Sequence, residues 1–232
     1  KAIVQDFELL TTGRTSQAIP EDVFTVNPEQ ILIEEGAVIL NSSLNASDGP
    51  VYIGKATEVM EGSHIRGPFA LCEGSIVKMG AKIYGATTIG PHSRVGGEVG
   101  NSVFIGYTNK GHDGFLGNSV LGEWCNLGAD TNNSNLKNNY ASVRLWNYPT
   151  GRFDDTNLQF CGLIMGDHSK SGINTMFNTG TVVGVSANIF GSGFPRNFIP
   201  SYSWGGASGT TTYQLRKVFE VAEVVMNRRN KE

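Results

Sequence analysis

Aliphatic residues recur at every sixth position through the first half of the chain, a spacing that fits neither an α-helix nor a β-hairpin. The members of this series are Ile53, Val59, Ile65, Leu71, Val77, Ile83, Ile89 and Val95. Two residues before most of them stands a small side chain, at Thr57, Ser63, Ser75, Ala81, Thr87 and Ser93, with Phe69 as the exception. A separation of two places both side chains on one face of a strand. Each hexad therefore predicts a short strand with two inward side chains, followed by a turn that tolerates glycine or another small residue.

Strands this short cannot bury an apolar face alone, but three hexads can close a triangular coil of about eighteen residues and stack it on the next. Stacking pairs every backbone edge and fills the interior with a column of Ile, Val and Leu. Thirty glycines, spread along the chain, agree with many tight turns. The pattern predicts an all-β fold, a single-stranded parallel β-helix of hexapeptide repeats. Hexapeptide families with this pattern adopt the left-handed form.

The repeat is interrupted twice. Its register slips after Val95 and is restored at Ile105, and the stretch 107–114 is then predicted to loop out. A longer excursion is predicted at about 137–159. The aliphatic series continues around these breaks at Leu121, Leu127, Met165, Phe177, Val183 and Ile189. Insertions on a solenoid are where function usually lies.

These patterns divide the chain into three parts. Residues 1–30 show weak periodicity and are predicted to be an irregular lead-in or linker, 31–200 the β-helix, and 201–232 a C-terminal extension with a helix. Residues 210–212 are expected to cap that helix, which should cover the open end of the column. Its apolar positions are Leu215, Val218, Phe219, Ala222, Val225 and Met226. Because the chain begins with Lys rather than Met, we expect a fragment or processed product of a longer protein.

Composition narrows the partners and the compartment. A formal charge of -3 without a long basic run gives no electrostatic reason to expect nucleic acid or a membrane surface, so small metabolites are the expected partners. There is no apolar run of about eighteen residues and no signal-peptide layout at the start. Cys72, Cys125 and Cys161 are widely spaced and form no CxxC, which indicates neither a disulfide framework nor a zinc cluster. A cytoplasmic protein without a metal is expected.

Two segments resemble a known family. The run 110–129, KGHDGFLGNSVLGEWCNLGA, is similar to the catalytic stretch of the glucosamine-1-phosphate acetyltransferase domain in bifunctional N-acetylglucosamine-1-phosphate uridylyltransferases. That stretch reads close to K-x-G-H-x-x-Y-L-G-D-x-x-I-G-x-x-x-N-x-G-A. The T-G-R at 150–152 and the run LIMGDHSKSGIN at 163–174 resemble the archaeal members. The resemblance covers roughly residues 50–200, and its looped histidine with spaced partners is more specific than hexads, which occur in many acyltransferases.

The resemblance implies an N-acetyltransferase that uses acetyl-CoA as co-substrate and acts on an amino sugar phosphate, like glucosamine-1-phosphate, or on a nucleotide sugar. It also implies a homotrimer with sites between subunits. His112 matches the general base that takes a proton from the acceptor amine, and histidine exchanges protons near neutral pH. Asn135 matches an asparagine near the reacting centre, and Asn126 an acceptor-binding one. Ala129 matches the position whose backbone N–H polarises the thioester carbonyl.

Several of these assignments have an ordinary structural alternative. Asn132, Asn133, Asn138 and Asn139 make the alignment of Asn135 ambiguous, and any of these asparagines can instead fill a left-handed turn. The coenzyme A channel of the family matches Gly172, Ile173, Phe190 and Gly191, which are also compatible with plain coil turns. Arg196 is a candidate for a coenzyme A phosphate or a surface arginine.

The chain also departs from the family. Phe115 stands where the family has a tyrosine that bonds the acceptor, and Gly100 where the bacterial enzymes have a phosphate-binding lysine. Arg94 and Lys110 are near enough in sequence to substitute. The long excursion adds groups suited either to a sugar phosphate or to packing on a neighbouring subunit, namely Tyr140, Arg144, Trp146, Tyr148 and Arg152.

Two other functions are compatible with a β-helix. One is a non-catalytic trimerisation or regulatory module of a sugar-1-phosphate nucleotidylyltransferase, which the changes at Gly100 and Phe115 keep open. The other is a zinc-dependent γ carbonic anhydrase, which requires three histidines with one pair five positions apart. His64, His92, His112 and His168 contain no such pair, and all but His112 are expected to be turn or surface residues.

Overall fold

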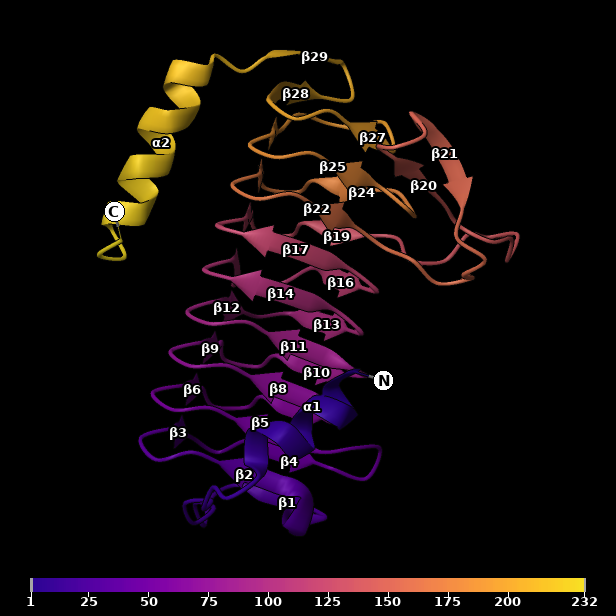
Figure 1. Ribbon diagram of the computed structural model, residues 1–232. Coiled ribbons are helices and arrows are strands. Elements are labelled where there is room, and N and C mark those ends of the chain that lie inside the picture. Colours follow the sequence, from indigo (N-terminus) through magenta and orange to yellow (C-terminus); the bar gives the residue numbers. More distant parts are fainter. Residues whose placement is uncertain (1, 232) are drawn as a thin grey trace. The chain divides into compact units, whose positions relative to one another are not determined.

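The computed structural model describes residues 2–231, which fall into two compact units, one up to Gly117 and one from Asn118 on. Each unit is a stretch of left-handed parallel β-helix, as the hexads predict (Figure 1).

Three parallel sheets form the walls of the first unit. The first sheet consists of β1 (Phe24–Val26), β4 (Ser43–Asn45), β7 (His64–Arg66), β10 (Lys82–Tyr84), β13 (Glu98–Gly100) and β16 (Phe115–Gly117). The second consists of β2 (Ile31–Ile33), β5 (Val51–Ile53), β8 (Phe69–Leu71), β11 (Thr87–Ile89) and β14 (Val103–Gly106). The third consists of β3 (Val38–Ile39), β6 (Glu58–Val59), β9 (Ile76–Val77), β12 (Arg94–Val95) and β15 (Asn109–Lys110). Each coil contributes one strand to each wall.

The interior of the first unit is the predicted column. All eight aliphatic residues of the series are at most 1% exposed, and the small residues two positions earlier are also buried. Ile105 is an error of the sequence prediction, because its side chain is 48% exposed and Phe104 points inward instead. Phe104 pairs with Ile89, fifteen residues earlier, so this coil is three residues shorter than the preceding one, in which Leu71 pairs with Ile89.

The stretch 107–114 does not loop out as a whole. Its middle forms β15, in which Lys110 pairs with Val95, and only 111–114 make a turn before β16. The hydrophobic pattern does not show this strand, because its inward position carries Lys110 instead of an aliphatic residue. Backbone pairing continues where the hydrophobic pattern stops.

The second unit continues the same architecture. One wall consists of β17 (Val120–Glu123), β22 (Ile164–Met165), β25 (Val182–Val183) and β27 (Phe198–Ile199). Another consists of β18 (Asn126–Leu127), β23 (Lys170–Ser171), β26 (Asn188–Ile189), β28 (Ser203–Gly206) and the antiparallel β29 (Gly209–Thr212), and a short one of β19 (Asn132–Asn133) and β24 (Met176–Phe177). The six aliphatic or aromatic residues predicted for this interior are at most 2% exposed.

The predicted long excursion is confirmed, and it forms a hairpin outside the coils of the second unit (Figure 1). Its strands are β20 (Arg144–Asn147) and β21 (Arg152–Asp155). Trp146 stacks on Phe198 of the last coil with ring centroids 4.1 Å apart, and Tyr148 meets the same ring edge-on. The aromatic side of the hairpin therefore packs on its own chain.

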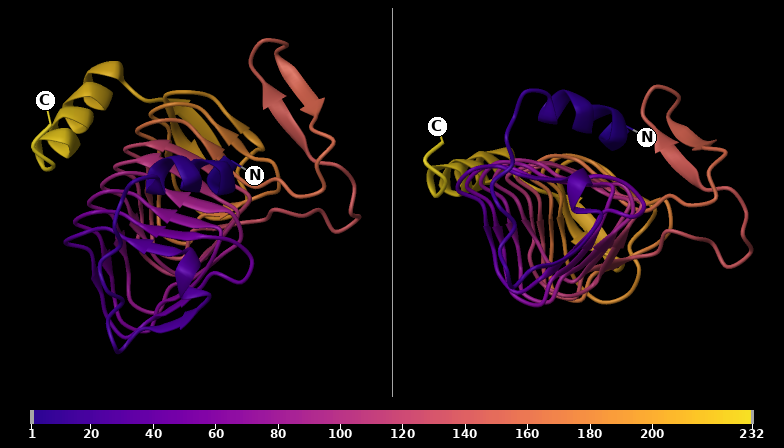
Figure 2. Two further views of the ribbon diagram at one scale, coloured as in Figure 1. Left: turned by 60° about the horizontal axis from the view of Figure 1, so that its bottom comes forward. Right: turned by 90° about the horizontal axis from the view of Figure 1, so that it is seen from below.

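The first residues are more ordered than an irregular lead-in. Helix α1 (Ala2–Thr11) lies on the outside of the second wall, where Phe7 and Leu10 pack on Leu32, Tyr52 and Ala70 (Figure 2). The first coil strand is β1, which lies ahead of the predicted boundary at 31. A short 3₁₀ helix at Pro28–Gln30 follows it. Helix α1 packs on apolar residues that point outward from the coils. A pattern of inward positions does not include these residues, so it does not predict the helix.

The C-terminal helix exists, as predicted, but it is capped and placed differently. Helix α2 spans Leu215–Asn227 and starts after Gln214, which makes no side-chain capping bond. Residues 210–212 belong to β29 instead. The helix projects from the end of the second unit rather than lying across the open coil (Figure 1). Val218 is its buried residue, whereas Phe219 is 61% exposed.

Several coil corners hold residues larger than the glycine or small residue expected. His92, Tyr107, Trp124 and His168 all have φ between 52° and 59°, the left-handed conformation. In the first unit His92 and Tyr107 have ring centroids 5.0 Å apart, and in the second Trp124 and His168 stack at 6.0 Å. Ring contacts between successive corners compensate for a conformation that non-glycine residues disfavour.

His168 should make the fold sensitive to acid. Burial, with a contribution from Lys170, lowers the pKa of this histidine, and its Nδ1 has no hydrogen-bond partner in the part of the chain that is described. The unfolded chain then binds more protons, so stability present above about pH 6.5 is lost as the pH falls toward the folded pKa. Asparagine tolerates the left-handed corner, and His168→Asn is expected to reduce the fall in Tm between about pH 8 and pH 5.5. The exposed His64→Asn serves as control, and an undiminished fall in His168→Asn would contradict the assignment.

Candidate functional site

His112 lies in the short turn 111–114, between β15 and β16 of the first unit, and its side chain is exposed. The Lys110 ammonium donates a hydrogen bond of 2.5 Å to the His112 carbonyl oxygen, so the turn is anchored through its backbone. Phe115 opens β16 three residues later and is half-buried. The imidazole is therefore exposed to solvent, while the hydrogen bond from Lys110 fixes the backbone of its turn.

Two glycines of the preceding coil contact the backbone of this turn. A Cβ on Gly96 would lie 2.7 Å from the carbonyl oxygen of Gly111, and one on Gly97 would lie 2.9 Å from that of His112. Such distances leave no room for a side chain. The turn that carries His112 thus rests directly on backbone.

Gly96→Ala is expected to displace this turn. Gly96 has an ordinary φ, so alanine adds a clash without backbone strain. A displacement of a few tenths of an ångström to about 1 Å should lower kcat of any reaction that uses the His112 imidazole about 10- to 100-fold. Gly54→Ala is the matched control, since its Cβ would meet backbone at 2.9 Å in a coil far from His112. An equal loss of kcat in both variants, at equal loss of Tm, would contradict a specific role of Gly96 in supporting the turn of His112.

The residues predicted to replace the phosphate-binding lysine do not gather around Phe115. Lys110 is 2% exposed and its ammonium bonds the His112 carbonyl, so its assignment as an acceptor contact stays a prediction. Arg94 lies on β12, which belongs to a different wall from Phe115 and pairs with Asn109 of β15. The register partner of Phe115 on the next strand is Glu98. A phosphate beside Phe115 would therefore face a carboxylate.

In the second unit, the Asn135 side chain bonds the side chain of Asn118. Its Nδ2 donates to Oδ1 of Asn118 at 2.8 Å. The side-chain amides of Asn132 and Asn133 donate to nearby backbone carbonyls, as expected for turn asparagines. Asn118 occupies the G-N/D position of the motif. The sequence therefore contains both asparagines at the family spacing, but it does not show that their side chains bond to each other.

Asn126 is exposed on β18 and pairs in register with Lys170 of β23. Burial lowers the pKa of Lys170, whose ammonium donates to the His168 carbonyl at 3.1 Å. Asn126 therefore points to solvent beside a cation that the sequence analysis did not single out.

Ala129 and most of the predicted coenzyme A residues share one edge of the second unit. The Ala129 carbonyl accepts a hydrogen bond of 2.8 Å from the backbone N–H of Asn174. The backbone N–H of Ala129 has no hydrogen-bond partner among the described residues. A Cβ on the preceding Gly128 would lie 2.6 Å from the carbonyl carbon of Gly172, so these turns stack backbone on backbone. This stacking brings Ala129 to the turn that carries Ile173.

The next coil extends the same edge. A Cβ on Gly172 would lie 3.3 Å from Cβ of Phe190, which precedes Gly191. Ile173 is 71% and Phe190 42% exposed, and the Phe190 ring meets Trp204 edge-on. The edge thus offers an unbonded amide next to exposed apolar side chains, which suits a thioester and its pantetheine arm.

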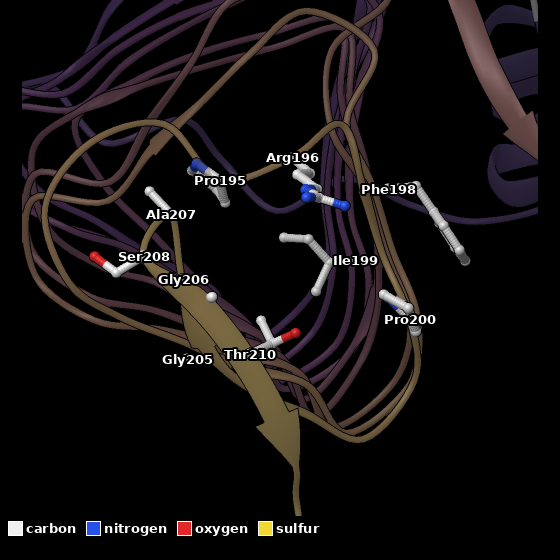
Figure 3. A pocket seen from close by; sticks show the side chains of 11 residues that line it. Pro195, Arg196, Phe198, Ile199, Pro200, Gly205, Gly206, Ala207, Ser208 and Thr210 are labelled. Carbon is white, nitrogen blue, oxygen red and sulfur yellow. The ribbon is translucent and has the colours of Figure 1, made fainter.

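Arg196 lines a hollow of about 500 Å³ at the end of the second unit (Figure 3). The hollow lies between β27 and the β28–β29 hairpin, and its floor includes Ile199. The guanidinium group is exposed there, opposite the small residues Ala207 and Ser208 (Figure 3). A cation in an open hollow of this size can meet a phosphate group.

The architecture and the motif define a hexapeptide-repeat left-handed β-helix domain. No family model matches the chain. Over 87 residues it is 34% identical to the "Bifunctional protein GlmU" of Methanocaldococcus jannaschii, which covers 38% of this chain and 21% of that protein. This partial match confirms the family resemblance drawn from the motifs. The chain spans about a fifth of the length of that relative.

Three solved structures with a similar fold share 13–15% sequence identity with the chain. The polySia-specific acetyltransferase NeuO is 13% identical with a TM-score of 0.46, covering 82% of this chain and 85% of its own. The N-acyltransferase AntD from Bacillus cereus, in complex with dTDP-4-amino-4,6-dideoxyglucose and coenzyme A, is 14% identical with a TM-score of 0.37, covering 96% of both chains. An Arabidopsis UDP-N-acetylglucosamine acyltransferase is 15% identical with a TM-score of 0.34, covering 88% and 77%.

No helix among the described residues is long and apolar enough to span a membrane. They also contain no group of three or more His, Cys, Asp or Glu side chains arranged to hold a metal ion.

Proposed function

We propose that this chain is an acyltransferase that moves the acetyl group of acetyl-CoA to the amine of an amino sugar phosphate or nucleotide sugar. The observation that carries the proposal is the exposed His112, held in a turn that rests on Gly96 and Gly97 and lies within the motif of the similar family. The partial match to the Methanocaldococcus protein supports the same class.

The reaction assigns a separate task to each residue. The acceptor amine attacks the thioester carbonyl carbon, and the imidazole of His112 takes the proton that the nitrogen loses. The negative charge on the carbonyl oxygen needs an N–H donor, and the unbonded amide of Ala129 is the candidate. Collapse of the tetrahedral intermediate breaks the C–S bond, and the departing thiolate of coenzyme A takes up a proton. The products are an amide and free coenzyme A.

Acetyl-CoA is proposed to lie along the edge formed by Ile173, Phe190 and Gly191, with Arg196 meeting one of its phosphates. Asn126 is proposed to contact the acceptor, and Asn135 to contact both the acceptor and the thioester. We further propose a cytoplasmic homotrimer. The exposed apolar face of α2, which includes Leu215 and Phe219, supports contacts between copies of the chain.

Two measurements test this function. Calorimetric titration should show saturable binding of acetyl-CoA, and a thiol assay should detect coenzyme A release with glucosamine-1-phosphate, galactosamine-1-phosphate or a nucleotide-linked amino sugar. Absence of both binding and release would contradict the proposal. The alternative of a non-catalytic module, which the glycine at position 100 favours, predicts no release with any acceptor.

A further inference from the structure

A second hollow, of about 480 Å³, lies on the outer face of the first wall of the first unit. It is lined by β4, β7, β10 and the loop after β4, and its polar residues include Asn45, Asp48, His64, Arg66, Lys82 and Tyr84. His64, Arg66 and Lys82 come from neighbouring strands and are all exposed. None of them belongs to the motif that carries the family resemblance.

The charges in this hollow suit an anion. Arg66 forms one contact of 3.3 Å with Asp48, which uses one of the five N–H donors of a guanidinium group. The Lys82 ammonium has no hydrogen-bond or ion-pair partner among the described residues. Nδ1 of His64 shares a hydrogen bond of 2.8 Å with the Ser43 hydroxyl, so its ring is oriented by the neighbouring strand. Two permanent cations and a histidine therefore face a single carboxylate.

The hollow shares its sheet with the residues that follow His112. Lys82 of β10 pairs in register with Glu98 of β13, which pairs with Phe115 of β16. Two strand spacings therefore separate Lys82 from Phe115, about 10 Å along the outer face, and Arg66 lies one strand further.

Among the described residues, β13 places no cation between Phe115 and the hollow. The register positions on β13 are Glu98 and Gly100, and the Tyr84 hydroxyl donates to the Glu98 carboxylate at 2.5 Å. That bond and burial raise the pKa of Tyr84 to about 12. A phosphate attached directly to a sugar at Phe115 would meet the Glu98 carboxylate, whereas a longer phosphate chain would reach Lys82 and Arg66.

We propose that this hollow binds the nucleoside diphosphate part of a nucleotide-linked amino sugar, which is then the acceptor class. The inference rests on the proposed function, because it takes the amine to lie near His112. Lys82 and Arg66 bind the diphosphate oxygens. Asn45 and Asp48, at the far end, supply hydrogen-bond partners for ribose and base.

The test is calorimetric titration of UDP, dTDP, GDP and glucosamine-1-phosphate into the full chain and its variants. At least one nucleoside diphosphate should bind saturably, and Arg66→Ala and Lys82→Ala should each weaken it about tenfold or more. Lys55→Ala is the matched control, an exposed lysine paired with Glu73 outside the hollow, and should bind like the original chain.

The outcomes separate this inference from the proposed function. Absence of saturable binding by all three nucleotides, or equal binding in the variants, would overturn the nucleotide site. Binding of glucosamine-1-phosphate alone, lost in Lys82→Ala, would also overturn it and would assign the hollow to a sugar phosphate. Coenzyme A release that depends on His112 can persist in either case, and its absence would remove the proposed function without changing the binding result.

Discussion

His112→Ala is expected to lower kcat for acetyl transfer about 10²- to 10⁴-fold, the range that a positioned general base contributes. The side chain is exposed and packs in no core, so Tm should change little. Coenzyme A release and thermal unfolding measure the two effects on one preparation.

The matched control for that prediction is His92→Asn. His92 occupies a left-handed corner of the same unit, and asparagine suits its φ of 55°. Its turnover should stay close to that of the original chain. Full activity in His112→Ala, or an equal loss in both variants, would refute the assignment of His112 as the base.

Lys110→Met should separate activity from stability. Lys110 occupies an inward position, paired with Val95, and its ammonium holds the carbonyl of His112. Methionine restores an apolar side chain in an apolar column, so removing the buried charge should leave Tm unchanged or raise it. The turn loses its anchor, and kcat should fall about 10- to 100-fold because the imidazole is less well positioned.

The split between kcat and KM identifies the role of Lys110. A positioning residue should change kcat with little change in KM for the acceptor, because it is buried and does not reach a bound sugar. A rise in KM at constant kcat would indicate a direct acceptor contact, as the sequence analysis expected. Val95→Met, a nearby inward substitution without charge, controls for repacking of the column.

The hydrophobic pattern predicted most of the coil interior, with Ile105 and Lys110 as exceptions. Inward side chains of a β-helix stack in a column, so a period of six in the sequence translates directly into burial. Ile83 and Leu127, in different units, are both buried as expected. The family motif points to His112 and Asn135, and the experiments above test their proposed roles.

What the sequence determined by itself is therefore the β-helix, its interior, its long excursion and the position of the motif. The tertiary structure alone decided that Ile105 points outward and that Lys110 points inward, because their orientation depends on pairing with a coil only fifteen residues earlier. It also decided that His64, Arg66 and Lys82 share one hollow. Residues about one coil apart become neighbours only when backbone hydrogen bonds set the register between coils, and no local window of sequence contains that information.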